Sequence, residues 1–534
     1  MGNRLDGRVS LLMTAIIALI CLEDSAHFRV EAGRSGPGGR IPQAFNSKRD
    51  DRKAPSQDQQ SIPTPQSYKS NAELLAAMAD YQSRCSKISR IYTIGKSVKG
   101  VPLTVLEISD FPGKYEPEPA FKYVGNMHGD EPSGRELLLY LAEWLCANYL
   151  KEPKDPMATF IVENIHLHLL PSMNPDGYDR RTRNNANDVD LNRDFPDQYN
   201  PINNIENGRQ PETLAIMKWI RNIPFTASAS LHEGALVASY GWDGTVTGRT
   251  GYSETPDDAA FRHMASLYSQ NNPVMKSSSE FLGGITNGAS WYPLYGGMQD
   301  WNYIHGNCFE ITIEMVEEKS PNISKIPELW QQHQQSLLEL AASVAKTGVH
   351  GRVMSAVDGS SLQAKIVVKG NDKPINASAT LGDYHRILPP NPSSSKNYEL
   401  TAKFPGYISR QTTVVLSPWK ATTLDFVLEP LPRKGAAPIQ VPCVGQELAY
   451  HCAEARVAKG IGPWLPRKLV KNLDHQDMVS TVQVELFFVI TAGTVVVVVA
   501  AAFFALARRR RSLTRGQSFR FHQPMSPSSM RRKP

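Results

Sequence analysis

The stretch "GNMHGDEPSGREL", residues 125–137, places a histidine and a glutamate three positions apart. His128 and Glu131 follow the apolar run "FKYVGNM", so a strand should end just before them, and Pro132 could open the next helix. In open α/β sheets, ligands bind beyond the carboxyl ends of strands. The pair alone is equally compatible with an ordinary loop. Hydrolytic zinc sites commonly combine two His with one Glu and keep a fourth position for water, so a third ligand is required.

That third ligand should follow another strand. His232 meets this condition, because it ends the apolar run in "TASASLHEG". His166 and His168 compete with it, but both lie inside the predicted strand "IHLHLL", and His305 lies in a predicted loop. On spacing alone, His128, Glu131 and His232 are therefore as consistent with a metal site as with three unrelated polar residues.

Two further stretches carry groups suited to peptide chemistry. Arg183, Asn192 and Arg193 fall within eleven residues, and forked guanidinium donors beside an amide suit a carboxylate. An exposed Arg-rich loop neutralised by nearby aspartates is the alternative. In "CFEITIEM", Glu310 and Glu314 share one face of a predicted strand. Either they face water or one faces a site, where a partly desolvated glutamate would serve as general base near zinc-bound water.

The elements that must position these residues follow from the apolar patterning. Between 67 and 347, apolar strands alternate with amphipathic helices, which predicts an α/β domain with a largely parallel or mixed sheet. The predicted strands lie at 120–129, 164–174, 224–233 and 307–315. The predicted helices lie at 132–150, 211–223, 257–270 and 326–348.

A second domain follows. Residues 348–430 contain short alternating strands between turn signals, which predicts a small β-sandwich. It has no cluster of catalytic residue types, so a packing or interaction role is expected. A chain of 534 residues accords with two or more domains. The net charge of +6 is small and sits largely in the tails, which favours solvated tails over nucleic-acid binding.

The two ends of the chain predict a secreted, membrane-anchored protein. Residues 1–26 have the charged, apolar and small-residue regions of a signal peptide, and 27–66 have the composition of a disordered linker. After a stalk at 431–485, the uncharged stretch 486–507 is long enough for a transmembrane helix. The following "RRRR" predicts that the tail, 508–534, is cytoplasmic, which gives a single-pass type I topology.

Cysteines and glycosylation motifs fit that compartment. Cys443 and Cys452 are close enough in sequence to pair, and the other pairing is left open, with Cys85–Cys146 as one option and Cys308 as a buried thiol. Glycosylation acceptors are predicted at Asn322 and Asn376.

Taken together, residues 67–430 resemble a zinc metallocarboxypeptidase of the N/E, or regulatory, subfamily. The resemblance is carried by "GNMHGDEPSGREL", "NPDGY", "RRTRNNANDVDLNRDFPD", "LHEGALVASYGWD", "TNGASWYPLYGGMQDWNY" and "NCFEITIEM", in the family's order. The predicted sandwich is similar to the transthyretin-like domain of that subfamily. With the signal peptide and anchor, the chain looks most like membrane-bound, carboxypeptidase D-like members.

The resemblance implies one Zn²⁺ held by His128, Glu131 and His232. It also implies that Glu314 is the catalytic glutamate and that Arg183 stabilises the oxyanion.

For the substrate, the resemblance implies that Asn192 and Arg193 hold the free C-terminal carboxylate. Tyr292 matches the mobile tyrosine that closes over the bound residue, with Tyr303 as a rival, and Asp243 matches the acid that reads Lys or Arg. The sequence departs from the subfamily where Glu233 replaces a glycine after the third ligand. It departs again at "YGWDG" and "EMVEEKSP".

The implied activity is release of C-terminal Lys or Arg from peptides and proteins, with precursor processing as a hypothesis. The expected location is the Golgi, endosome or plasma membrane, with the catalytic domain luminal or extracellular, and the expected state is a monomer. Two alternatives stay open: a non-catalytic membrane receptor that binds C-termini, and a carboxypeptidase with a non-basic preference.

Overall fold

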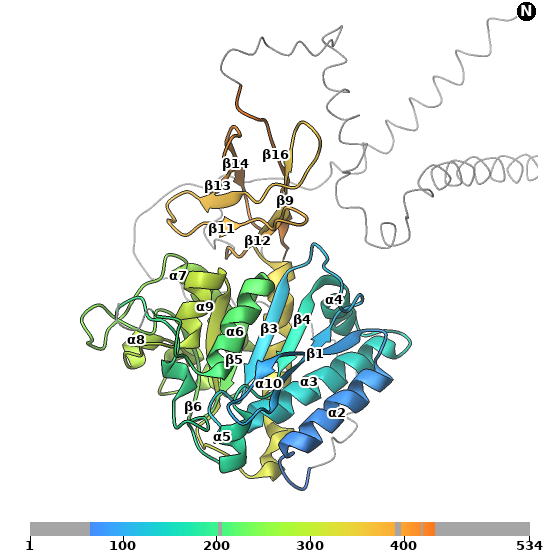
Figure 1. Ribbon diagram of the computed structural model, residues 1–534, viewed down its shortest axis with the longest axis vertical. Helices are drawn as coiled ribbons and strands as arrows, with labels where there is room; N and C mark the ends of the chain where they lie inside the picture. Colours follow the sequence, from blue (N-terminus) through green and yellow to red (C-terminus); the bar gives the residue numbers. More distant parts are fainter. Residues whose placement is uncertain (1–64, 201–204, 390–396, 418–419, 433–534) are drawn as a thin grey trace, which may run out of the picture. The chain divides into compact units, whose positions relative to one another are not determined.

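A mixed sheet of eight strands organises the first and larger part of the described chain (Figure 1). The computed structural model describes residues 65–200, 205–389, 397–417 and 420–432. The central neighbours β4, β3, β5 and β8 run parallel. β2 pairs antiparallel with both β1 and β4, whereas β6 pairs antiparallel with β8 and parallel with β7. In sheet order the strands are β1 (Ser89–Lys96), β2 (Pro102–Ile108), β4 (His166–Leu170), β3 (Ala120–Gly125), β5 (Phe225–His232), β8 (Phe309–Val316), β6 (Ala235–Tyr240) and β7 (Ile285–Asn287).

Helices cover both faces of this sheet, which is why its central strands β4, β3, β5 and β8 are buried almost throughout. On one face α10 packs against α3, α4 and α7, and on the other α6 packs against α9. The helices are α2 (Asn71–Arg84), α3 (Ser133–Leu150), α4 (Pro156–Asn164), α5 (Pro175–Arg180), α6 (Pro211–Asn222), α7 (Asp258–Asn271), α8 (Gly288–Trp291), α9 (Met298–Gly306) and α10 (Ile326–Lys346). The mixed α/β architecture predicted from the sequence is therefore confirmed.

After α10 the described chain forms two smaller sheets that enclose one apolar core. One sheet has the order β11-β10-β13-β14, and the other has the order β12-β9-β15, with β16 also paired to β9. These strands are β9 (Val349–Ser355), β10 (Lys365–Val368), β11 (Ile375–Asn376), β12 (Asp383–Arg386), β13 (Tyr398–Lys403), β14 (Arg410–Val414), β15 (Thr422–Thr423) and β16 (Phe426–Leu428).

The described residues contain one disulfide bond and one free cysteine. Cys85, which caps α2, is joined to Cys146 of α3, with their Cα atoms 6.1 Å apart. Cys308 is free and buried just before β8. The pairing that the sequence left open is thus Cys85–Cys146, while Cys443 and Cys452 lie outside the described residues.

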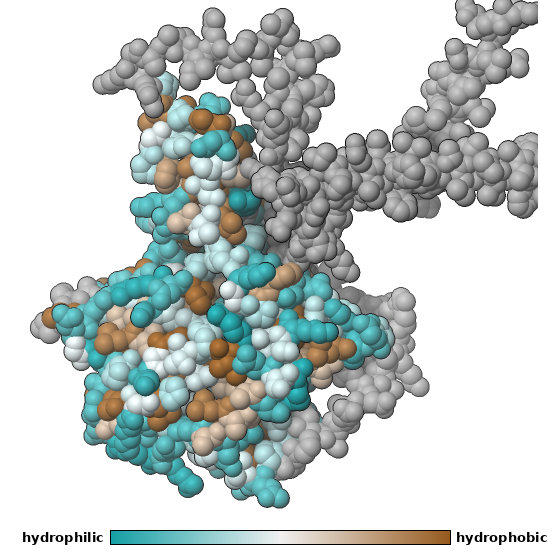
Figure 2. All heavy atoms as spheres, turned by 45° about the vertical axis from the view of Figure 1, so that its right-hand side comes forward, coloured by the Kyte–Doolittle hydropathy of each residue, from teal (hydrophilic) through white to brown (hydrophobic). Residues whose placement is uncertain are grey.

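The predicted targeting segments have a different status. The signal peptide, stalk, membrane span and basic tail lie wholly or almost wholly outside the described residues. Within the described ranges, no helix combines the length and apolarity needed to cross a membrane. On the face seen in Figure 2, hydrophobic residues are scattered among hydrophilic ones, as is normal for a folded surface.

A buried ion pair connects the sheet of β12 to the residue that precedes α7. The Arg386 guanidinium donates to both carboxylate oxygens of Asp257, at 3.0 and 2.5 Å, and both side chains are buried. The Tyr303 hydroxyl donates to the same carboxylate at 2.7 Å. Asp257 directly precedes α7, so its carboxylate links the start of this helix to Arg386 of β12.

We expect Arg386→Met to lower the free energy of unfolding by about 3–5 kcal/mol, because it removes one partner of a buried pair and leaves the other charge. The exposed Arg410→Met is the matched control and should stay within about 0.5 kcal/mol. Denaturant unfolding of the protein truncated before residue 486 measures both. Equal, small losses in the two variants would contradict this role of the pair.

Candidate active site

Two adjacent parallel strands bring the predicted metal ligands together. His128 and Glu131 lie in the turn after β3, and His232 is the last residue of β5, which pairs with β3 along its length. All three side chains are buried. The Nδ1 atom of His128 lies 3.0 Å from Glu131 Oε1 and 3.2 Å from Nδ1 of His232, and the latter lies 3.0 Å from Glu131 Oε2.

This arrangement fits a zinc ion. Bonds of about 2.0–2.2 Å in a tetrahedral site place the ligand atoms roughly 3.3–3.6 Å apart, close to the separations just given. Although burial opposes it, hydrogen bonds from the two histidines hold the pKa of Glu131 well below its usual range, so the carboxylate stays charged. Among the described residues, these three form one of two groups whose ligand atoms could converge on a metal.

Asp190 contacts both His128 of the predicted metal site and Arg183. Its Oδ1 lies 3.1 Å from Nε2 of His128, and its Oδ2 accepts a hydrogen bond from Nε of Arg183 at 2.9 Å. A carboxylate on the far ring nitrogen orients a ligating histidine and directs Nδ1 to the metal. From the sequence, Asp190 is one of the aspartates that could neutralise the Arg-rich loop, and its role beside His128 is not predicted. Its place in "DVDLNRD", beside predicted substrate residues, was the available signal.

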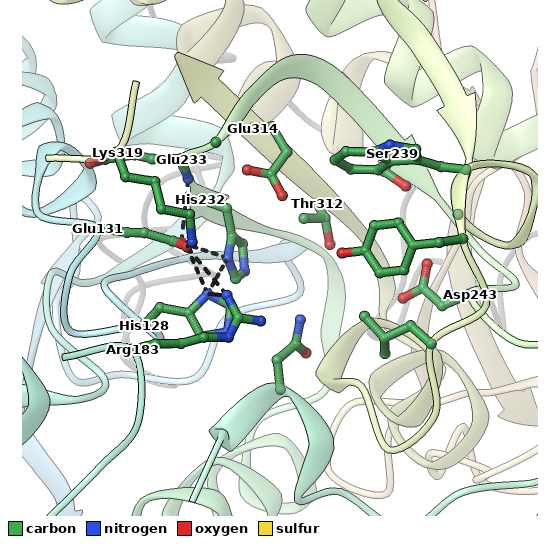
Figure 3. A pocket seen from close by; sticks show the side chains of 16 residues that line it. His128, Glu131, Arg183, His232, Glu233, Ser239, Asp243, Thr312, Glu314 and Lys319 are labelled. Atoms are coloured by element: carbon green, nitrogen blue, oxygen red, sulfur yellow. Dashed lines mark hydrogen bonds and ion pairs between the residues drawn. The ribbon is translucent and has the colours of Figure 1, made fainter. Parts of the chain in front are cut away.

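Glu314 lies beside the cluster because its strand pairs with β5, in a register that sets it opposite His232. Its side chain is buried in the pocket, and Oε2 has no hydrogen-bond partner among the described residues (Figure 3). Burial raises the pKa of Glu314 to about 7. Glu310 differs, because it is fully buried in an ion pair with Lys122 at 2.8 Å. Of the two glutamates on this strand, Glu314 faces the site.

Asp243 closes the opposite end of the pocket (Figure 3). It follows β6, and its Oδ1 accepts a hydrogen bond from Gln299 at 2.8 Å. The carboxylate of Asp300 accepts the backbone N–H of Asp243 at 3.1 Å. Gly288 borders the acid closely, since a Cβ there would lie 1.9 Å from Oδ1 of Asp243. Burial raises the pKa of both carboxyls, so two acids share a site with little water.

Comparison with known proteins gives the family of this fold and site. Residues 74–336 match the family described as zinc carboxypeptidase. Carboxypeptidase SOL1 of Arabidopsis thaliana is 56% identical over 376 residues, which cover 70% of this chain and 75% of that protein. The chain belongs to the zinc carboxypeptidase family.

Its relatives include members of the N/E subfamily. Carboxypeptidase N catalytic chain of Mus musculus is 39% identical, and the match covers 67% of this chain and 85% of that protein. Carboxypeptidase D of Homo sapiens is 44% identical over 361 residues, which are 64% of this chain but only 25% of that longer protein. This zinc carboxypeptidase is therefore a metallohydrolase of peptide bonds, and zinc is its metal.

The remaining predicted site residues of the carboxypeptidase lie around the same pocket. Asn192 lines it and accepts the backbone N–H of Met298 at 3.0 Å through its oxygen, which leaves its amide nitrogen for a ligand. Arg193 does not line the pocket, but burial raises the pKa of both Asp243 and Tyr292, and the positive charge of Arg193 partly offsets that rise.

The two candidate tyrosines differ in their exposure to solvent and in their contacts. Tyr292 is 42% exposed and lines the pocket, as a mobile residue should. Tyr303 is buried and its hydroxyl is bound to Asp257, so it is a core residue. The competing histidines are also elsewhere: His166 and His168 are buried in β4, and His305 stacks on Trp301 at the end of α9.

Proposed function

We propose that this zinc carboxypeptidase releases Lys or Arg from free peptide C-termini. Asp243 carries the proposal, because it is an acid buried at the end of the pocket that holds the metal ligands. A buried carboxylate without a cation is costly, and Asp300 beside it raises that cost. The ammonium or guanidinium of a bound Lys or Arg would neutralise this negative end. An apolar or acidic side chain would leave it unpaired.

The rest of the pocket supports exopeptidase action. Asn192 lines the pocket, and Arg193 beside it in sequence lies 4.0 Å from the carboxylate of Asp190. The free C-terminal carboxylate of a substrate would bind to these two donors. Forked, permanently charged donors suit that group. A substrate whose C-terminus is amidated would leave Arg193 without its counter-charge. Tyr292, half-exposed at the same place, would cover the bound residue.

Each catalytic group then has a defined task. His128, Glu131 and His232 would hold the zinc ion, which supplies a water of lowered pKa and a Lewis acid for the scissile carbonyl. Glu314 takes a proton from the attacking water and returns it to the leaving amine. Arg183, anchored by Asp190, places a fixed positive charge where the oxyanion develops.

The compartment forms part of the proposal. The Cys85–Cys146 bond suits an oxidising environment, as expected for a luminal or extracellular domain behind a signal peptide. Asn322 and Asn376 are both exposed, so each could accept a glycan. We also propose that 348–430 is a transthyretin-like domain and that 486–507 anchors the protein in the Golgi, endosome or plasma membrane. Peptide precursor processing is the proposed setting.

The test is release of the last residue from peptides that differ only there. Peptides ending in free Arg, Lys, Glu or Leu, and one ending in amidated Arg, are incubated with the enzyme with and without a zinc chelator. We expect release of free Arg and Lys alone, and its loss with chelator, because catalysis needs the metal and Asp243 needs a cation.

Other outcomes would favour the alternatives. Chelator-sensitive release of Leu or Glu in preference to Arg would assign a non-basic specificity. Binding of free C-termini by the zinc-loaded protein without any hydrolysis would favour a receptor.

A further inference from the structure

The pocket has a second charged end, opposite Asp243. Lys319, which follows β8, lines it on the far side of the metal ligands, and Glu314 lies between the two ends (Figure 3). If Asp243 takes the released residue, as the proposed function holds, the rest of the peptide must extend across the metal ligands toward Lys319. The residue that precedes the scissile bond would then lie beside this ammonium.

Lys319 is accessible at this position. Its side chain is 41% exposed, and its Nζ lies 2.7 Å from Oε1 of Glu131. Its aliphatic stem passes over Gly234, whose φ of +122° and missing side chain leave room, since a Cβ there would lie 3.0 Å from Cε of Lys319. When a metal ion is bound, Glu131 would share its negative charge with that ion, which would leave the ammonium of Lys319 able to pair with a substrate as well.

Glu233 fixes the backbone that carries Lys319. It is buried beside His232, and its two carboxylate oxygens bind backbone N–H groups rather than the metal ligands. One oxygen accepts the N–H of Ser133 at the start of α3, and the other accepts the N–H of Ser320 at 2.7 Å. Ser320 has a φ of +52°, a conformation that persists only where its surroundings impose it.

The segment that follows Lys319 makes a second hydrogen bond to the body of the domain. The Tyr68 hydroxyl donates to the carbonyl of Pro321 at 2.8 Å. The two residues that follow Lys319 are thus both tied to the body of the domain, so the lysine starts from a defined position at the pocket edge.

We propose that Lys319 is a specificity-determining residue that binds an acidic side chain at the position before the scissile bond, and that Glu233 is its positioning residue. The enzyme should therefore prefer Glu-Arg over Gln-Arg at the C-terminus, and should disfavour Lys-Arg, because like charges would meet. This inference rests on the proposed release of a C-terminal Arg.

The experiment compares kcat/KM for N-blocked peptides that end in Glu-Arg, Gln-Arg or Lys-Arg. For the unmodified enzyme we expect a Glu-Arg to Gln-Arg ratio of about three to ten, the range of a half-exposed ion pair. That ratio should fall toward one as salt rises from about 0.01 M to about 1 M. Lys319→Met should bring it to one, and Lys319→Glu should make Lys-Arg the better substrate.

Lys325→Met is the matched control, because that lysine is exposed and paired with Glu318 away from the pocket lining. It should keep the ratio of the unmodified enzyme. A ratio near one in the unmodified enzyme, or a ratio retained in Lys319→Met, would overturn the proposal. Chelator-sensitive release of Arg from all three peptides would leave the proposed function intact in either case.

Glu233→Gln tests the positioning role separately. It should lower the ratio toward one while zinc content stays unchanged, and combining it with Lys319→Met should change the ratio no further, since the two residues act as one unit. Equal losses for all peptides, with the ratio retained, would mean that Glu233 is only structural. If no peptide is hydrolysed, calorimetry of the same peptides with the zinc-loaded protein measures the ratio as a ratio of Kd values.

Discussion

Replacing Glu314 by Gln should reduce kcat for release of C-terminal Arg by about 10²–10⁴-fold, the usual contribution of a positioned general acid–base. The amide has nearly the same shape but cannot take the proton of the attacking water. Burial raises the pKa of the native carboxyl to about 7, which places its proton affinity in the range that such a base needs. Steady-state kinetics on a peptide ending in free Arg measure the loss.

Two comparisons make this result specific to the chemical step. Zinc content should not change, because Glu314 is opposite His232 in the sheet but is not one of the three converging ligands. Glu318→Gln, an exposed glutamate in the next segment, should retain full activity. Loss of zinc in the Glu314 variant, or full activity in that variant, would assign the base to another residue.

Much of this site could be anticipated from the sequence because it depends on the ends of buried parallel strands. β3 and β5 are covered on both faces, so their apolar runs mark them clearly, and the polar residues after them must meet at one sheet edge. The alternation along β8 indicated only that Glu310 and Glu314 share one face, and the family resemblance was needed to select Glu314, which lines the pocket in the structure.

Other parts depend on packing that no local pattern encodes. That Glu310 pairs with Lys122 follows from the register of three strands far apart in sequence. Likewise, Asp300 reaches Asp243 only because α9 packs beside the loop that follows β6. The direction of the Glu233 side chain could not be predicted from local sequence either. Its two backbone partners come from segments about a hundred residues away on either side in sequence.

Replacing Asp243 by Asn should reduce kcat/KM for a peptide ending in Arg by roughly 30- to 4,000-fold. Truncating one partner of a buried charge pair costs about 2–5 kcal/mol, and each 1.4 kcal/mol is a factor of ten. A peptide ending in Leu should lose little or gain, since the variant no longer buries an unpaired charge beneath it. The ratio of the two kcat/KM values isolates this residue from the shared chemical step.

The pH dependence of that ratio gives an independent check. Burial raises the pKa of Asp243 above the usual range for an aspartate, while the charge of Arg193 lowers it in part. Because the charged form binds the cation, the preference for Arg over Leu should weaken as the pH falls through that raised pKa. The arginine of the substrate remains charged throughout, since its pKa is about 12.5 or higher.

In the Asn variant the ratio should no longer depend on pH in this range, although kcat/KM for each peptide still follows the titration of Glu314. A ratio that varies with pH equally in both proteins would place the titrating group elsewhere, with Asp300 as the nearest candidate. An unchanged preference for Arg in the variant would remove Asp243 from substrate recognition altogether. The residue that carries the proposed function can thus be tested apart from the metal site and the general base.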